Sequence, residues 1–450
     1  MPRAPVPPVP PVVKPTFAEA LRFWLKLGFM SFGGPAGQIA IMHTVLVEQK
    51  RWISDAKFLH ALNYCMLLPG PEAQQLATYI GWLLHGTRGG LVAGILFVLP
   101  SVFILLALSL LYVTVGTLPA LQGVFMGLKP AVVAIILLAL VKIGQKSLLS
   151  PLHYAVAGAS FVGIFFLNIP FPLLIIGAAG VALVARRLFP VPAATAAVQA
   201  RAAQAEEGYF LTTRTVVPGT GFSGPRLLRQ AVAAGVLWVL PLGLFRLFAS
   251  DFGFWRGLSV FFTQAALVTF GGAYAVLPYV AQVSVAKLHW LTQGQMLDGL
   301  ALGETTPGPL IMVLAFVGFM GGYTHFGGSL AFGALGLLST TYYTFLPCFV
   351  FILVGAPLIE RTQHNASLKA VLSIITAAVV GVVLNLAVYL GRAVLFPAGH
   401  LSVAQLHGPS LAWLLVSVVA LYRFKVNMIR WIGVSAAAGL LYYLVAAYVG

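Results

Sequence analysis

A carboxylate, two hydroxyls and a helix breaker stand together inside an apolar stretch of this sequence, in the segment GETTPGPLI from Gly303 to Ile311. Proline cannot donate a backbone hydrogen bond and clashes with the preceding turn, so Pro-Gly-Pro ends one helix and can begin another. The new helix begins with unpaired N–H groups and a partial positive charge, which attract anions. The chemistry that this segment favours is therefore the binding of a small oxyanion.

The same breaker occurs a second time, and a glycine-rich motif also occurs twice. Residues 69–71 (PGP) match residues 307–309, and residues 31–38 (SFGGPAGQ) match residues 269–275 (TFGGAYA). Glycines permit irregular backbone and let a ligand approach N–H groups closely. One such break in a membrane helix is more often a packing kink. Two copies of both motifs favour a binding site, because breaks in hydrocarbon must line a polar cavity or be buried in protein.

The polar side chains near these breaks are the candidates for direct contact with the anion. They are Gln38, Gln74, Gln75, Tyr274, Thr305 and Thr306. Lys129, in GLKPAVV, either faces the same pathway or extends its ammonium group to the membrane interface as an anchor.

Two carboxylates flank the Pro-Gly-Pro motifs on opposite sides. Glu72 lies three residues after Pro69, whereas Glu304 lies three residues before Pro307. A fixed negative charge would repel a dianion unless the carboxyl group were protonated or paired with a cation. Because intramembrane carboxylates are functional by default, we hypothesise that Glu72, Glu304 or both link proton occupancy or gating to anion binding. The alternative for Glu72 is that it stabilises the first turn of its helix.

The composition places these motifs in a membrane. Hydrophobic residues make up 60% of the 450 positions and charged residues only 8%, with a mean hydropathy of +0.96. These values predict an all-α polytopic membrane protein. A net charge of +16 would suggest nucleic acid in a soluble protein, but here the Lys and Arg residues lie mainly in loops and at helix ends. They are expected to anchor the protein in membrane lipid and to suit an anionic substrate, with no nucleic-acid partner.

Other classes of function lack the residues that they need. Cys65 and Cys348 are too few and too far apart for a disulfide framework or a metal site, and we expect both in the core. Motifs such as HExxH and GxSxG do not occur, so we expect no catalytic centre, no metal and no cofactor. A cation carrier would require several carboxylates around its broken helices, and the chain contains only 10 Asp and Glu residues.

Apolar segments fall into two sets that repeat each other. The first set lies at about 17–47, 60–86, 89–114, 119–143, 151–168 and 171–185, and the second at about 259–286, 296–322, 327–355, 368–391, 409–424 and 431–449. An offset of 238 aligns residues 32–71 with the second set without a gap, giving 11 identities in 40 positions. After a slip of nine residues, Pro100 aligns with Pro347. The chain is therefore an internal duplication.

The segment between the two sets decides how they are oriented. We predict a disordered Pro-rich tail (residues 1–16), a first six-segment repeat (17–187), a polar linker with one extra transmembrane helix (188–258) and a second six-segment repeat (259–450). Six crossings return the chain to its starting side, and the extra helix then inverts the second copy. This predicts about 12–13 transmembrane helices in two inverted-topology repeats, with broken or re-entrant helices and a midplane site.

The distribution of basic residues predicts a cytoplasmic N-terminus, a cytoplasmic linker and a periplasmic C-terminus. Lys50, Arg51 and Lys57 are exceptions, because counting segments places them on the outside. If a segment beside them is re-entrant, the side of that loop changes.

Four long motifs resemble one family. FGGPAGQIAIMHTVLVEQKRW, LLPGPEAQQLATYIGW, FGGAYAVLPYVAQ and DGLALGETTPGPLIMVLAFVGF closely resemble the chromate transporter family in its long, two-domain form, and the resemblance covers nearly all of the chain from about Phe17. It implies an exporter in the bacterial inner membrane that removes chromate and confers resistance, with sulfate as a close analogue. It also implies that the site includes the motif residues Gly33, Gly34, Pro35, Pro69, Gly70, Pro71, Gly271, Gly272, Pro307, Gly308 and Pro309.

From the residues and the resemblance together, we expect a secondary transporter that exports chromate by alternating access and is not an enzyme. The alternatives left open are a carrier of sulfate or another oxyanion, and an anion channel. A homodimer is compatible with the sequence.

Overall fold

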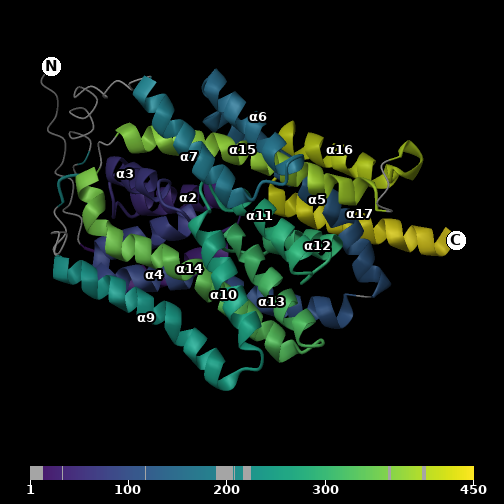
Figure 1. Cartoon of the computed structure of the whole chain (residues 1–450), viewed down its shortest axis with the longest axis horizontal. Helices are drawn as coiled ribbons and strands as arrows, with labels where there is room; N and C mark the ends of the chain where they lie inside the picture. The colour runs from purple at the N-terminus through teal and green to yellow at the C-terminus, as the bar shows by residue number, and fades with distance from the viewer. Residues whose placement is uncertain are drawn as a thin grey trace, which may run out of the picture.

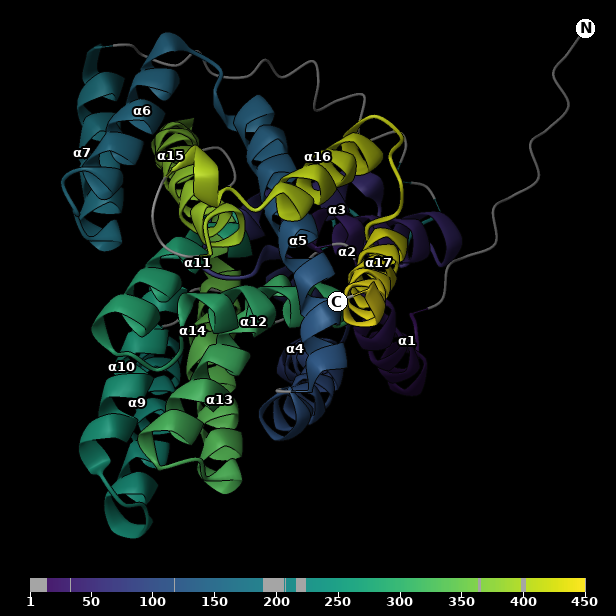
Figure 2. The ribbon, with the colours of Figure 1, turned by 90° about the vertical axis from the view of Figure 1, so that its right-hand side faces the viewer.

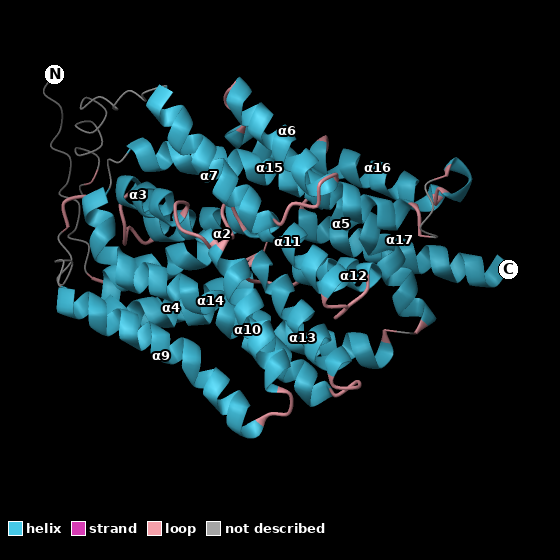
Figure 3. Ribbon diagram, viewed as in Figure 1, coloured by secondary structure: helices cyan, strands magenta, loops and turns pink. Residues whose placement is uncertain are grey.

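The computed structural model describes residues 14–32, 34–116, 118–188, 206, 208–215, 224–362, 366–397 and 402–449. Within these residues the protein is built from helices and loops, with one isolated bridge and no strand (Figures 1 and 3). Six of the helices are long and apolar enough to cross a membrane. The prediction of an all-α polytopic membrane protein is confirmed.

The helices recur in the same order in the two halves of the chain. The first half contains α1 (Phe17–Met30), α2 (Gly34–His43), the π-helix η1 (Thr44–Gln49), α3 (Asp55–Cys65), α4 (Glu72–Val115), α5 (Pro119–Ser147), α6 (Pro151–Phe165) and α7 (Phe171–Leu188). After α9 (Gly224–Phe248), the second half contains α10 (Phe252–Leu267), α11 (Ala273–Ala281), η2 (Gln282–Lys287), α12 (Gln293–Thr305), η3 (Leu310–Met312), α13 (Val313–His325), α14 (Leu330–Thr362), α15 (Ala366–Leu395), η4 (Val403–Gln405), α16 (Gly408–Tyr422) and α17 (Met428–Val449).

The boundaries of these elements follow the offsets found in the sequence. The two π-helices start at Thr44 and Gln282, and the N-caps of α3 and α12 are Ser54 and Thr292, so both pairs are 238 residues apart. Helix breaks separate α1 from α2, α3 from α4, α10 from α11 and α12 from α13. All four breaks lie at the glycine-rich and Pro-Gly-Pro motifs, as predicted.

The helices α1 and α2, with η1, form a re-entrant hairpin. Lys50 Nζ, at the end of η1, lies 2.7 Å from Glu19 Oε1, near the start of α1. The two ends of the hairpin therefore lie on one face of the molecule. The 14 residues of α1 extend only about 21 Å, which is less than the roughly 30 Å of a hydrocarbon core. We therefore expect the tip of the hairpin, at Ser31 and Phe32, to lie within the depth of the membrane.

The helix α3 and the first part of α4 form a second hairpin on the same face. The helix α4 is kinked at His85 and Gly86, whose backbone dihedral angles are non-helical. His85 Nε2 lies 3.0 Å from the carbonyl oxygen of Pro15, directly before α1. Residues 72–84 therefore return to the face where α1 begins, and residues 87–115 form the first long crossing. The sequence left re-entrant helices as an alternative, and the structure contains them.

The second half contains the same two hairpins. Asp251 Oδ2, before α10, lies 2.7 Å from Nε2 of His325, the last residue of α13. Trp290, in the loop between η2 and α12, stacks obliquely on Phe254 with ring centroids 5.7 Å apart. The two ends of both hairpins thus lie together. This face, named the far face below, adjoins the C-terminal end of α9, a 25-residue helix about 37 Å long (Figure 1).

The opposite face, named the linker face below, carries the described residues of the linker. The backbone N–H of Phe210 donates to the carbonyl oxygen of Arg51 at 3.2 Å, and the N–H of Ser54 donates to that of Leu211 at 2.8 Å. The segment count had placed Lys50, Arg51 and Lys57 on the side away from the linker. The sequence left the side of this loop open, because a re-entrant segment beside it would change that side. The structure has this arrangement, since the hairpins return the chain to the face where they start.

The remaining long helices exchange partners between the halves. The helix α5 packs against α16 and α17 of the second half, and α15 packs against α6 and α7 of the first half. Figure 2 shows these helices as one group, above a second group that contains α1, α4, α10, α13 and α14. At the α5–α17 contact, a side chain at Gly127 would collide with the backbone of Ser435, so the small residue permits close packing.

Candidate functional site

The tips of the four hairpins meet in a reciprocal pattern. The N–H of Gly70 donates to the carbonyl oxygen of Thr269 at 2.7 Å, and the N–H of Gly308 donates to the carbonyl oxygen of Ser31 at 2.7 Å. These pairs are equivalent under the offset of 238. Gly308 is the equivalent of Gly70, and Thr269 is the equivalent of Ser31. Each half therefore makes the same contact with the other, which is the pattern of two copies related by a two-fold rotation. The two Pro-Gly-Pro motifs and the two glycine-rich motifs therefore surround one centre.

Gly70 and Gly308 are required by their conformation and by their neighbours. Their φ angles are +122° and +110°, a region that side chains rarely adopt. A Cβ at Gly70 would lie 2.7 Å from Cys348 Sγ, and a Cβ at Gly308 would overlap Ser101 Oγ. Ser101 and Cys348 are themselves equivalent, 247 residues apart. The Ser101 hydroxyl donates to the carbonyl oxygen of Pro307 at 2.5 Å.

The three predicted glutamines donate hydrogen bonds from their amide groups to acceptors within and beside the hairpin tips. Gln38 Nε2 donates to the carbonyl oxygens of Gly308 (2.6 Å) and Ser31 (3.4 Å). Gln75 Nε2 donates to Pro69 O at 2.7 Å, and Gln74 Nε2 to Thr78 Oγ1 at 3.1 Å. All three side chains are buried, and their amide oxygens have no hydrogen-bond partner among the described residues. Direct contact between these amides and an anion stays a prediction.

The threonines of the second Pro-Gly-Pro motif end the helix α12. The hydroxyls of Thr305 and Thr306 both donate to the carbonyl oxygen of Leu302, at 2.8 and 2.7 Å. Thr305 also lines a cavity of about 350 Å³ whose other lining residues are Val124, Leu128, Ile429, Ile432, Gly433 and Ala436. Because Thr305 is its only polar residue, this cavity does not suit an oxyanion. The N–H groups in the first turns of the helices that start at the tips are better donors.

The other motif residues lie at the same breaks. Gly34 and Pro35 begin α2, Gly271 and Gly272 precede α11, and Pro71 and Pro309 are the N-caps of α4 and η3. Gly33 lies outside the described residues.

The two predicted carboxylates have different surroundings. Glu304 is 5% exposed and accepts a hydrogen bond of 2.7 Å from the Tyr274 hydroxyl, so two candidate residues form one buried pair. Glu72 is partly buried in the first turn of α4, where a negative charge is stabilised by the unpaired N–H groups.

Lys129 has a partner that the sequence reasoning missed. Its Nζ lies 3.2 Å from Asp298 Oδ1, and the Tyr112 hydroxyl donates to Asp298 Oδ2 at 2.9 Å. Asp298 is one of only ten acidic residues and lies six positions before Glu304 in the same apolar segment. Its position in that segment was the signal that could have identified it.

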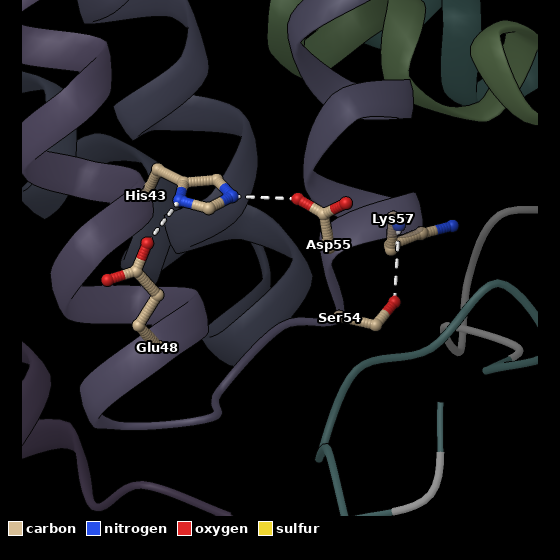
Figure 4. A network of polar contacts seen from close by, with 5 residues as sticks. All are labelled: His43, Glu48, Ser54, Asp55 and Lys57. Atoms are coloured by element: carbon tan, nitrogen blue, oxygen red, sulfur yellow. Dashed lines mark hydrogen bonds and ion pairs between the residues drawn. The ribbon is translucent and has the colours of Figure 1, made fainter. Parts of the chain in front are cut away.

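The linker face carries an exposed polar network. His43 lies between Glu48 (Nδ1 to Oε1, 3.2 Å) and Asp55 (Nε2 to Oδ1, 2.7 Å), as Figure 4 shows. Nearby, the buried hydroxyl of Ser54 donates to Glu206 Oε1 of the linker at 2.7 Å. Burial of Glu206 opposes its ionisation, but hydrogen bonds from Thr213 and Ser54 outweigh it and lower the pKa of this carboxyl. Among the described residues, no group of three or more His, Cys, Asp and Glu side chains could hold a metal ion.

Comparison with known proteins agrees with this architecture. The family model described as "Chromate transporter" matches residues 18–184 and 256–440, so it covers both halves and omits most of the linker and α9. The "Chromate transport protein" of Pseudomonas aeruginosa is 32% identical over 389 residues, which are 83% of this chain and 80% of that protein. The protein with the same name from Cupriavidus metallidurans is 28% identical over 411 residues, 91% of this chain and 89% of that protein. No solved structure matches the chain.

Proposed function

The chain belongs to the chromate transporter family, and we propose that it is a secondary transporter that exports chromate across the bacterial inner membrane by alternating access. Sulfate, a tetrahedral dianion of similar size, is expected to compete for the same site. The observation that carries this proposal is the reciprocal contact of the four hairpin tips, Gly70 with Thr269 and Gly308 with Ser31.

The path of the chain supports an inverted arrangement of the two repeats. The second part of α4 with α5, α6 and α7 makes four crossings if the short helices α6 and α7 both span the membrane, and two if they enter and return as a pair; the number is even in both cases. The chain thus returns to the linker face, and α9 then carries it to the far face. The hairpins of the second half therefore enter from the side opposite to those of the first half. This is the arrangement in which tips from both repeats form a midplane site.

The orientation that we propose places the linker face in the cytoplasm and the C-terminus in the periplasm. With the hairpins re-entrant, Lys50, Arg51 and Lys57 lie on the same face as Arg214 of the linker. The excess of basic residues in short loops on one face is the expected signature of the cytoplasmic side.

The helix ends at the tips supply the chemistry for an oxyanion. Each tip begins a helix whose first N–H groups are free of intrahelical partners and carry partial positive charge. The two groups of helices then move against each other about this centre and expose it to each face in turn. Export of a dianion from a cell that is negative inside is favoured by about 4.6 kcal/mol per 100 mV for two charges. Glu72 and Glu304 are therefore not needed to drive export, and their proposed role is to couple or gate it.

The test measures chromate accumulation in cells that express the protein, with and without excess sulfate. We compare the wild type with a Pro307→Ala, Pro309→Ala double variant and with Pro241→Ala as a control. Pro241 lies within α9, away from the tips, so its loss removes an intramembrane proline without changing the site. Lower chromate accumulation in the wild type and the control, but not in the double variant, supports the proposal.

Two results would contradict the proposal. Equal chromate accumulation in wild-type and non-expressing cells would show that chromate is not the exported substrate. Flux in reconstituted vesicles that does not saturate and never runs against a gradient would indicate an anion channel.

A further inference from the structure

The ion pair of Lys129 and Asp298 joins the two halves of the protein within the membrane. Lys129 lies on α5, which packs against α16 and α17, whereas Asp298 lies on α12, which leads to the second Pro-Gly-Pro motif. Charged side chains inside a membrane are costly and usually mark a substrate or ion pathway. A pair that served only to hold α5 and α12 together could be replaced by apolar packing at little or no cost.

The two partners are unequally enclosed. The Asp298 side chain is 9% exposed and, besides the ion pair with Lys129, accepts a hydrogen bond from Tyr112, whereas the Lys129 side chain is 30% exposed. Tyr112 is itself held between Phe125 and Phe316, with ring centroids 5.5 and 5.4 Å away. The carboxylate is therefore fixed in place. The ammonium group has three donors and pairs with Asp298 at 3.2 Å, which leaves it capacity for another oxygen ligand.

The pair lies on the route from the far face to the hairpin tips. Lys129 Nζ is 3.9 Å from the position that a Cβ at Gly294 would take, in the first turn of α12. That turn follows directly on the loop of Trp290 at the far face. An anion that leaves the tips along α12 toward this face would pass the ammonium group.

The route on the linker side has different chemistry. The equivalents of Asp298 and Lys129 under the repeat offsets are His60 and Thr376. The duplication therefore places the acid and base only on the far side. A feature that served merely to pack the repeated helices would be expected in both halves.

We propose that Lys129 and Asp298 form an anion subsite between the tips and the far face, where a tetrahedral oxyanion replaces the Asp298 carboxylate as the partner of Lys129. The identity of the oxyanion as chromate or sulfate rests on the proposed function. Asp298 is the internal counter-ion that occupies Lys129 when no substrate is bound. Tyr112 continues to donate to Asp298 when Lys129 turns to the substrate, so the carboxylate is not left without a partner.

The exchange has a clear kinetic consequence. Without Asp298, Lys129 would hold a dianion in a poorly hydrated site and release it slowly, because charge pairs are strong where water is excluded. Without Lys129, the anion would lose its cation at this step. The two single substitutions should therefore change KM in opposite directions.

The experiment measures initial rates of chromate transport in proteoliposomes for the wild type, Lys129→Gln, Asp298→Asn and the double variant. Lys142→Gln, an exposed lysine near the other end of α5, is the matched control. We expect Lys129→Gln to raise KM on the order of tenfold, which corresponds to about 1.4 kcal/mol. Asp298→Asn should lower both KM and kcat, and the control should leave both unchanged.

The double variant keeps the test valid if a single substitution leaves an unpaired charge and prevents folding. A raised KM in the folded double variant supports the subsite. An unchanged KM in Lys129→Gln or in the double variant, beside an active wild type, overturns it and leaves the proposed function intact. A wild type that transports neither chromate nor sulfate overturns both.

Discussion

Replacing Gly308 by Ala tests whether the contact of the hairpin tips holds the two halves together. The φ angle of +110° at this position costs a residue with a side chain about 1–3 kcal/mol. The new methyl group would also overlap Ser101 Oγ, which donates to Pro307 O at 2.5 Å. Loss of that hydrogen bond in a buried site costs about 1–2 kcal/mol more. The total of about 2–5 kcal/mol is a large part of the 5–15 kcal/mol typical of folded domains.

The assay is the thermal midpoint of unfolding in detergent, followed by the transport rate of the protein that remains folded. We expect a clear decrease in the midpoint for Gly308→Ala. Addition of Ser101→Ala should recover part of it, because this change removes the overlapping hydroxyl but not the backbone strain. The control is Gly235→Ala in α9, where a Cβ meets no atom within 4 Å.

An unchanged midpoint for Gly308→Ala would refute the reasoning, since neither the strain nor the overlap could then be present. Equal midpoints for Gly308→Ala with and without Ser101→Ala would refute the part that assigns the cost to the hydroxyl. A decrease of the same size in Gly235→Ala would indicate a general effect of alanine in these helices.

Three further predictions follow from other contacts. Hydrogen bonds from the His325 side chain and from a backbone N–H lower the pKa of Asp251. The stability that the ionised Asp251 gives the protein is therefore complete above the ordinary pKa of Asp and is lost as pH falls through the lowered value. Asp251→Asn should therefore lower the thermal midpoint at pH 7 and flatten its dependence on pH between about 5 and 2; an unchanged pH profile would contradict this. Glu206→Gln should weaken the attachment of the linker to the loop of Ser54, because the hydroxyls of Thr213 and Ser54 donate hydrogen bonds to the Glu206 carboxylate and lower its pKa. We expect severalfold faster proteolysis within the linker at pH 7, and equal cleavage rates would show that the contact is not retained in solution. Gly127→Val places a branched side chain against the backbone of α17 and should abolish most folded protein, measured by size-exclusion chromatography. A monodisperse variant at wild-type yield would mean that α5 and α17 pack less closely than described.

The sequence alone determined the local features of this protein. Pro69 and Pro307, with their neighbouring glycines, end and begin helices for reasons that lie within a few residues, so the breaks could be predicted. The offset of 238 found in the sequence also separates the starts of the two π-helices and the caps Ser54 and Thr292 in the structure. The chemical class that we propose for the site also comes from these residues, because a helix start inside a membrane attracts anions.

The tertiary structure decided which of these features meet. Lys50 pairs with Glu19, and Gln38 bonds to Gly308, which is 270 positions away. Helix periodicity does not report contacts at such separations, so counting apolar segments left the side of the loop at residues 48–57 open. From the sequence, Lys129 could equally face the pathway or anchor the protein at the membrane interface. The structure shows instead that its ammonium group lies 3.2 Å from Asp298. Backbone breaks are local consequences of residue type, whereas the partner of a buried polar group depends on how the whole chain packs.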